Sequence, residues 1–183
     1  MGLFSSLKKK APELGPQTMI PKLVIGINQV DNLGPWDNVI NQPTDATEKI
    51  ILTRANDVIK KLNLTNIVAI HGRCEDFAKK PEFREKFDYC VARAVAKLNT
   101  LAEYCLPFVK LYGYMIAYKS RNAQQEIEEA TNALSTLGGK LMNIKVVDIF
   151  EIEAERNFLF IQKKFKTPLQ YPRFQNKPKT NPL

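Results

Sequence analysis

The chain has 183 residues, and its content of 44% hydrophobic and 25% charged residues is ordinary for one globular domain of moderate size. No apolar run approaches the roughly 20 residues that a membrane span needs, and we expect a cytoplasmic monomer without a membrane partner. The net charge of +8 favours an anionic partner, and nucleic acid is the commonest large one.

The three cysteines, Cys74, Cys90 and Cys105, are an odd number and lack the close spacing of metal ligands. They predict reduced thiols of the kind found in cytosolic proteins. We therefore expect neither a disulfide framework nor a metal site.

The first third of the chain predicts a tail followed by one β-loop-α unit. Residues 1–20 carry prolines and a lysine run and are expected to form a basic tail. A buried strand is expected over Leu23–Ile27, and a loop rich in Pro, Asn and Asp follows it. Apolar residues recur at helical spacing from about 46 to 62 and predict a helix there.

From Asn66 onward, strand-like and helix-like segments alternate. Strands are expected at 66–71, 88–92 and 112–119, and helices at 98–109 and 123–139. The second helix closes on Gly138 and Gly139, which a helix C-terminus favours. Two adjacent β runs predict an antiparallel hairpin at a sheet edge, formed by residues 140–150 and 157–164.

This alternation predicts one α/β domain over residues 21–164, with three layers and a mostly parallel sheet. Residues 165–183 are basic, rich in proline and free of acidic side chains. We expect them to form an extended tail rather than packed core. Removal of residues 167–183 should then leave the thermal transition nearly unmoved.

One polar stretch, HGRCEDF (71–77), directly follows the expected strand at 66–71. Ligands of open α/β sheets bind at the carboxyl ends of the strands. Glu75 or Asp76 can accept hydrogen bonds from an adenine amino group or ribose hydroxyls, and Arg93 can hold an anion after the next strand. The alternative is a solvated loop, because charged loop residues mostly lie on the surface. His71 has no evident partner, so we propose no catalytic residue.

A close resemblance to the second half of the bacterial 16S ribosomal RNA methyltransferase G family, also called GidB, is carried by three stretches. They are NLTNIVAIHGRCEDFAKKPEFREKFDYCVARAVAKLNTLAEYCLPFVK, then YGYMIAYK, and the ending TPLQYPR with KTNPL. The likeness runs from about residue 62 to the end. It implies a class I methyltransferase sheet of the Rossmann-like kind, S-adenosylmethionine as cofactor, and 16S rRNA as the partner, methylated on guanine N7.

The resemblance also implies roles for single residues. Cys74 and Glu75 fall where the family contacts the adenosine part of the cofactor, although alanine is more usual at the position of Cys74. Arg93 falls on the family's conserved arginine at the end of the next strand. In this chemistry the enzyme mostly positions N7, which has a free lone pair, so no general base is required.

The basic C-terminus interleaves cations with aromatic rings. Cations neutralise phosphates, and rings stack on unpaired bases, so the pattern predicts an RNA contact, which the resemblance to an rRNA-modifying family favours. The alternative is a solvated tail that only adds solubility. The expected contact residues are Lys163, Lys164, Lys166, Tyr171, Arg173, Lys177 and Lys179.

The first half of the family supplies a glycine-rich cofactor loop that has no counterpart here before residue 62. Residues 21–62 instead resemble the guanine-recognition segment of small bacterial GTPases, with the motif Asn28-Gln29-Val30-Asp31. No phosphate-binding GxxxxGK[ST] loop accompanies it. The chain thus resembles a composite, GTPase-like over 21–62 and methyltransferase-like over 63–164. Two alternatives to an active methyltransferase follow: a non-catalytic basic RNA-binding domain, and a guanine-nucleotide binder through Asn28 and Asp31.

Overall fold

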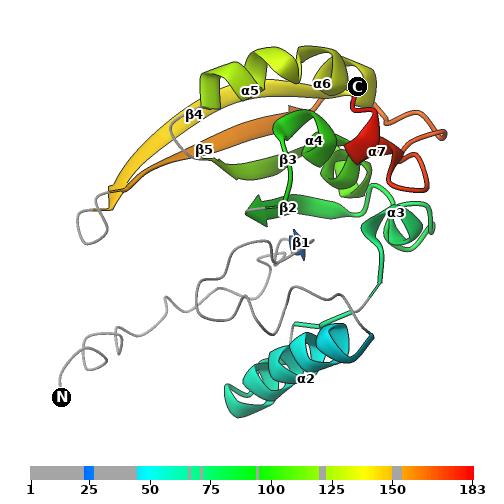
Figure 1. The fold of residues 1–183 in the computed structure, drawn as a ribbon, viewed down its shortest axis with the longest axis vertical. Coiled ribbons are helices and arrows are strands. Elements are labelled where there is room, and N and C mark those ends of the chain that lie inside the picture. Colours follow the sequence, from blue (N-terminus) through cyan, green and yellow to red (C-terminus); the bar gives the residue numbers. More distant parts are fainter. Residues whose placement is uncertain are drawn as a thin grey trace, which may run out of the picture.

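The elements of the fold are seen in a computed structural model (Figure 1), which describes residues 23–26, 45–65, 67–70, 72–93, 95–119, 123–149 and 154–183. In chain order they are β1 (Leu23–Gly26), α2 (Asp45–Lys61), α3 (Cys74–Phe77), β2 (Phe87–Arg93), α4 (Leu98–Cys105), the 3-10 turn η2 (Leu106–Phe108), β3 (Val109–Lys119), α5 (Ala123–Glu129), α6 (Thr131–Leu137), β4 (Gly139–Ile149), β5 (Ala154–Lys163) and α7 (Lys177–Thr180).

The strands form one mixed sheet in the order β1-β2-β3-β5-β4. Strands β1, β2 and β3 run parallel, whereas β5 is antiparallel to both β3 and β4. The expected hairpin at one sheet edge is therefore confirmed. The expectation of a mostly parallel sheet is confirmed in part: β1, β2 and β3 pair in parallel, but β5 returns between β3 and β4 and makes the other two pairings antiparallel, so the sheet is mixed.

The core lies between the sheet and the helices α4, α5 and α6, which cover one of its faces (Figure 1). Alternate residues of β3, Met115 and Ala117, are fully buried, as are Leu159 and Ile161 of β5. Such alternation is what a strand with one covered face requires. This accounts for two of the three expected layers, and the third stays a prediction.

The predicted strand at 66–71 is not formed by the residues that the structure describes there. Residues 67–70 have no regular structure, and Val68 is 79% exposed. Both edges of β2 are already paired, one with β1 and the other with β3. Residues 67–70 therefore cannot pair with β2, and in the structure they form no ladder with any strand of the sheet.

Most helix predictions are confirmed, with shifted ends. Helix α2 matches the prediction from 46 to 62. The helix expected at 98–109 ends at Cys105 and passes through η2 into β3. The helix expected at 123–139 is split at Ala130 into α5 and α6, and α6 ends on Gly138, whose φ of 82° is left-handed. Glycine adopts that conformation without the steric cost of a Cβ.

The C-terminal residues 165–183 do not form an extended tail. Thr167, Tyr171, Pro172 and Pro178 are buried, and α7 contacts α4. The Arg84 guanidinium donates hydrogen bonds to the carbonyl oxygens of Thr167 (2.8 Å) and Tyr171 (2.9 Å). The expectation is wrong because basic residues of this segment and of the body satisfy buried carbonyls and carboxylates instead of meeting solvent.

Candidate functional site

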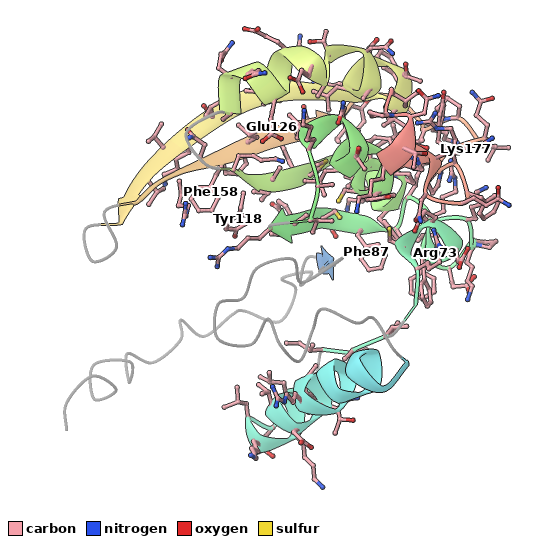
Figure 2. All side chains as sticks on the ribbon, viewed as in Figure 1. Arg73, Phe87, Tyr118, Glu126, Phe158 and Lys177 are labelled. Carbon is pink, nitrogen blue, oxygen red and sulfur yellow. The ribbon has the colours of Figure 1, made fainter. Side chains whose placement is uncertain are left out.

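The edge of the sheet where parallel strands β2 and β3 end is the place where α/β folds bind ligands. Arg93 is the last residue of β2, pairs in register with Tyr118 of β3, and has an exposed side chain. Lys119 ends β3 at the same edge. Figure 2 shows Tyr118 and Glu126 toward this end of the sheet. The edge therefore carries positive charge suited to an anionic group.

Lys119 is held by neighbours rather than turned to solvent. Its Nζ donates hydrogen bonds to the Ala96 carbonyl (2.7 Å) and to Glu126 Oε2 (2.6 Å). The same Glu126 oxygen accepts a hydrogen bond from the Leu98 backbone N–H (2.9 Å), the first residue of α4. Glu126 thus caps α4 and neutralises Lys119 together.

A second ion pair lies beside this one, on the solvent side. Lys97 donates to Glu129 Oε2 at 3.2 Å, and this hydrogen bond lowers the pKa of the exposed Glu129 carboxyl. An exposed pair of this kind contributes little stability. Arg93 is therefore the residue of this edge that we expect to meet a ligand.

Helix α3 carries the other two residues assigned to the cofactor. Glu75 is only 3% exposed, and its Oε1 accepts a hydrogen bond from Arg73 at 2.9 Å. Its Oε2 accepts a bond from the Cys74 thiol at 3.4 Å. Burial raises the pKa of the Cys74 thiol, and burial raises the pKa of nearby Tyr104 to about 12. The thiol is therefore protonated at neutral pH and is no activated nucleophile.

Helix α3 does not lie at the carboxyl end of the strands, which corrects the expectation for HGRCEDF. The Phe77 ring of α3 is 5.2 Å from Phe83, which is 6.4 Å from Phe87, the first residue of β2. Arg93 ends the same strand. Figure 1 accordingly shows α3 at the end of β2 opposite its arrowhead. Because residues 67–70 form no strand of the sheet, nothing brings α3 to the carboxyl edge.

The assigned cofactor residues therefore do not form one pocket. Cys74 and Glu75 lie at one end of β2 and Arg93 at the other, and both oxygens of Glu75 have protein partners. These residues, as arranged here, do not fit an adenosine group held jointly by all three. We accordingly derive no step of a reaction through the cofactor.

Two of the residues expected to contact RNA are buried. Lys163 has no exposed surface, and its Nζ donates to the Leu106 carbonyl (2.7 Å) and pairs with Glu85 (3.3 Å). Burial lowers the pKa of Lys163 to about 8. Tyr171 is 8% exposed and contributes to the hydrophobic core. Both assignments are corrected, because neither a phosphate nor a base can reach these side chains.

Arg173 is also largely engaged inside the protein. Its guanidinium donates to both oxygens of Glu103, from Nε at 3.0 Å and from Nη2 at 2.8 Å. Glu103 lies in the middle of α4 with 1% of its side chain exposed. Its hydrogen bonds raise the pKa of Arg173. The expected contact residues that remain exposed are Lys166, Lys177 and Lys179, with Lys164 half-buried.

Sequence reasoning missed the carboxylates that receive these cations. Glu103 stands in LNTLAEYC, where every residue of the helix is buried, and an acid among buried residues requires a cationic partner. The C-terminus, with six cations from Lys163 to Lys179 and no acid, is the obvious source of one. An acid in this apolar stretch was the available signal for a buried ion pair, but which of the six cations pairs with Glu103 is seen only in the structure.

Other predicted residues lie outside the described part of the chain, namely Asn28, Asp31 and His71, as do residues 1–20. Within the described ranges, no group of three or more His, Cys, Asp and Glu side chains is placed to hold a metal ion. The helices in those ranges include none that is both long and apolar enough to cross a bilayer.

Comparison with known proteins identifies the family. The model of the family "GidB: rRNA small subunit methyltransferase G" matches residues 52–157, and residues 21–51 lie outside that match. The ribosomal RNA small subunit methyltransferases G of Desulforamulus reducens and Lachnoclostridium phytofermentans are each 49% identical over 128 residues, which is 70% of this chain and 53% of theirs. The enzyme of Clostridium novyi is 46% identical over 118 residues, covering 64% of this chain and 49% of that protein.

The chain thus spans about half the length of the curated relatives it matches. The family match nevertheless covers more than half of the chain itself and contains β2, α4, β3 and the whole of α5 and α6. This chain therefore belongs to the rRNA small subunit methyltransferase G (GidB) family.

Proposed function

We propose that the chain acts in the cytoplasm on 16S rRNA of the small ribosomal subunit, as part of a guanine-N7 methylation that uses S-adenosylmethionine. The observation that carries this proposal is the family match over residues 52–157. The relatives at 46–49% identity bear names of the same activity. The chain spans about half of the length of these relatives, so their activity is a proposal for this chain.

The geometry supports the proposal at one place, the carboxyl edge of β2 and β3. Arg93 is exposed there, at the end of a parallel strand, beside a cluster that fixes α4 and α5 to the sheet. An exposed guanidinium at such an edge suits a phosphate or a carboxylate. We therefore propose that Arg93 contacts an anionic group of the substrate or cofactor, independently of Cys74 and Glu75.

A second candidate is a non-catalytic RNA-binding domain. It is favoured by the separation of Glu75 from Arg93, and by the exposed lysines of the C-terminal segment, Lys166, Lys177 and Lys179. The third candidate, a guanine-nucleotide binder within a composite chain, rests on Asn28 and Asp31, which lie outside the described residues.

Calorimetry of the full chain with S-adenosylhomocysteine and with GDP tests all three candidates. Binding of S-adenosylhomocysteine alone, together with transfer of labelled methyl groups to small ribosomal subunits, supports the first. Binding of GDP alone supports the third. Binding of an rRNA fragment with neither small molecule bound supports the second and overturns the first.

Within the first candidate, Arg93→Ala should weaken binding of S-adenosylhomocysteine or of rRNA by about 1–3 kcal/mol, the usual cost of losing a charged hydrogen-bond partner. Lys97→Ala, at the same edge but paired with Glu129, is the matched control. Equal affinities of both variants and the parent for both ligands would remove Arg93 from the site.

A further inference from the structure

We propose that single-stranded RNA binds on a surface between α3 and α7, where one exposed aromatic ring lies among lysines. This α3–α7 surface consists of Lys79, Lys80, Phe174 and Lys177. The inference rests on the proposed function in that it takes rRNA as the partner, and it names a contact surface that lies away from the carboxyl edge of the strands.

The ring at the centre of this surface is Phe174. It is 49% exposed, although its neighbours Tyr171 and Pro172 are buried. The Lys79 ammonium lies 3.2 Å from the centre of the ring. A large apolar side chain held at the surface with a cation beside it contributes little to the core. An exposed ring with a cation beside it suits single-stranded RNA, because a base can stack on the ring while the cation neutralises a phosphate.

The two remaining lysines come from the two segments that form this surface, which are far apart in the sequence. Lys80 is exposed, and its Nζ lies 4.5 Å from the centre of the Phe77 ring of α3. Lys177 begins α7, is exposed, and its backbone N–H donates to the Phe174 carbonyl at 3.2 Å. Figure 2 shows Lys177 and Arg73 at the same end of the molecule.

Hydrogen bonds hold the two segments in a fixed relation. Arg73 donates to the Asn176 side chain at 3.0 Å. Arg84 donates to the Ala78 carbonyl at 3.1 Å and to the Tyr171 carbonyl at 2.9 Å. The surface is therefore preorganised, and RNA binding does not have to order it first.

The buried carboxylates of this region are paired within the protein, whereas cations outnumber carboxylates at its surface. The carboxylates of Glu75, Glu85 and Glu103 accept hydrogen bonds from other residues of the protein. Two exposed carboxylates flank Lys79 and Lys80 in the sequence: Asp76, which lies in α3, and Glu82 in the turn that follows. Burial and the nearby Arg84 lower the pKa of Lys79, while Asp76 raises it. Because the C-terminal segment adds cations and no acidic side chain, the net field there favours a polyanion.

The test measures binding of a labelled, unstructured RNA of about twelve nucleotides to the full chain without cofactor, over a range of salt concentrations. Phe174→Leu keeps an apolar side chain but removes the ring, and should weaken RNA binding about fivefold to a hundredfold. It should leave binding of inorganic polyphosphate unchanged. Phe174→Tyr keeps the ring and should restore RNA binding.

The contribution of charge is tested with the double variant Lys80→Gln and Lys177→Gln, which should lower RNA affinity about tenfold. The dependence of log affinity on log salt should become less steep by about 1.4, because each neutralised phosphate of a single strand contributes about 0.7. The control is Lys60→Gln with Lys61→Gln on α2, which removes the same charge elsewhere. Equal losses in both pairs would reduce the effect to net charge and overturn the surface. Unchanged RNA binding by Phe174→Leu would overturn the stacking site.

These outcomes are separable from those of the proposed function. Loss of methyl transfer and of S-adenosylhomocysteine binding, with the Phe174 and lysine effects intact, removes the methyltransferase and keeps the RNA surface. Methyl transfer to small subunits that is intact in every variant, with no change in RNA binding, removes the surface and keeps the methyltransferase.

Discussion

Helices α2 and α4 both have apolar residues at helical spacing, yet α4 is buried and α2 is largely exposed. In α4 every residue from Leu98 to Cys105 is buried, including Glu103. In α2, Val58 is 53% exposed, and Leu62 just after it is 63% exposed. The segment that follows α2 continues the pattern, with Ile67, Val68 and Ile70 all exposed by about half or more.

The difference shows that an apolar stripe identifies a helix but not its partner. Helix α4 has the sheet on one side and α5, α6 and α7 beside it. The body of the protein, from β2 through α7, therefore contains most of the burial that stabilises a fold. We expect substitutions and truncations in this body to lower stability, and comparable changes near α2 to have little effect.

The largest effect is expected from removing residues 167–183. The truncation exposes the core around Tyr171, deprives Arg84 of carbonyl acceptors, and leaves Glu103 buried without Arg173. An uncompensated buried charge alone costs about 3–5 kcal/mol, so the total loss is roughly 5 kcal/mol or more. Chemical denaturation of the two chains measures it. An unchanged unfolding midpoint would mean that residues 167–183 form a solvated tail and are not part of the packed core.

A matched pair of leucines tests the two regions side by side. Leu101→Ala in α4 removes a side chain that is 1% exposed and should cost about 3 kcal/mol through lost burial and a cavity. Leu62→Ala removes a side chain that is 63% exposed and should change stability by less than about 0.5 kcal/mol. Denaturant midpoints at constant slope give both values. Similar losses in both variants would mean that α2 belongs to the same packed body.

Elements with strong local patterns were predictable from the sequence, as β2, β3 and α2 show. The hairpin was also predictable, because its two β runs are separated by only a short acidic turn. The absence of a strand at 67–70 was not predictable, because strand pairing depends on how the other strands of the sheet are ordered, and that is a property of the whole sheet. The residues of the candidate site were found one by one, but their separation followed from this missing strand.

The basic C-terminus also shows that contacts between distant residues are not predictable from the local sequence. The sequence predicts that its cations lie on the surface, and Lys177 and Lys179 are indeed exposed. For Lys163 and Arg173 this prediction fails, because composition does not report buried acceptors elsewhere in the chain. Glu85 and Glu103 supply these acceptors, and both lie more than 60 residues away in the sequence.

Arg173→Ala compares a paired cation of the C-terminal segment with an exposed one. It leaves Glu103 buried, and since the Arg173 side chain is 21% exposed, water reaches the site, so we expect a loss near 2–3 kcal/mol. Lys166→Ala, an exposed cation of the same segment, is the control and should change stability by less than about 0.5 kcal/mol. Thermal unfolding of both variants beside the parent chain gives the difference. A tail-like segment would show equal, small effects in both.

Lys163 gives the stability of the body a pH dependence above neutral pH. Burial lowers the pKa of Lys163 from 10.5 to about 8 in the folded state, so between those values the unfolded state binds more protons. Stability should therefore rise with pH from about 8 to 10.5, because the cost of burying the charge disappears as the amine loses its proton. The raised pKa values of Cys74 and Tyr104 act in the opposite direction at high pH, since the unfolded state loses those protons first. Lys163→Met keeps the length and burial of the side chain without the charge, so the difference between its pH profile and that of the parent isolates Lys163. If the two profiles run parallel across this window, Lys163 does not titrate as a buried amine, and the interior position of its charge is wrong.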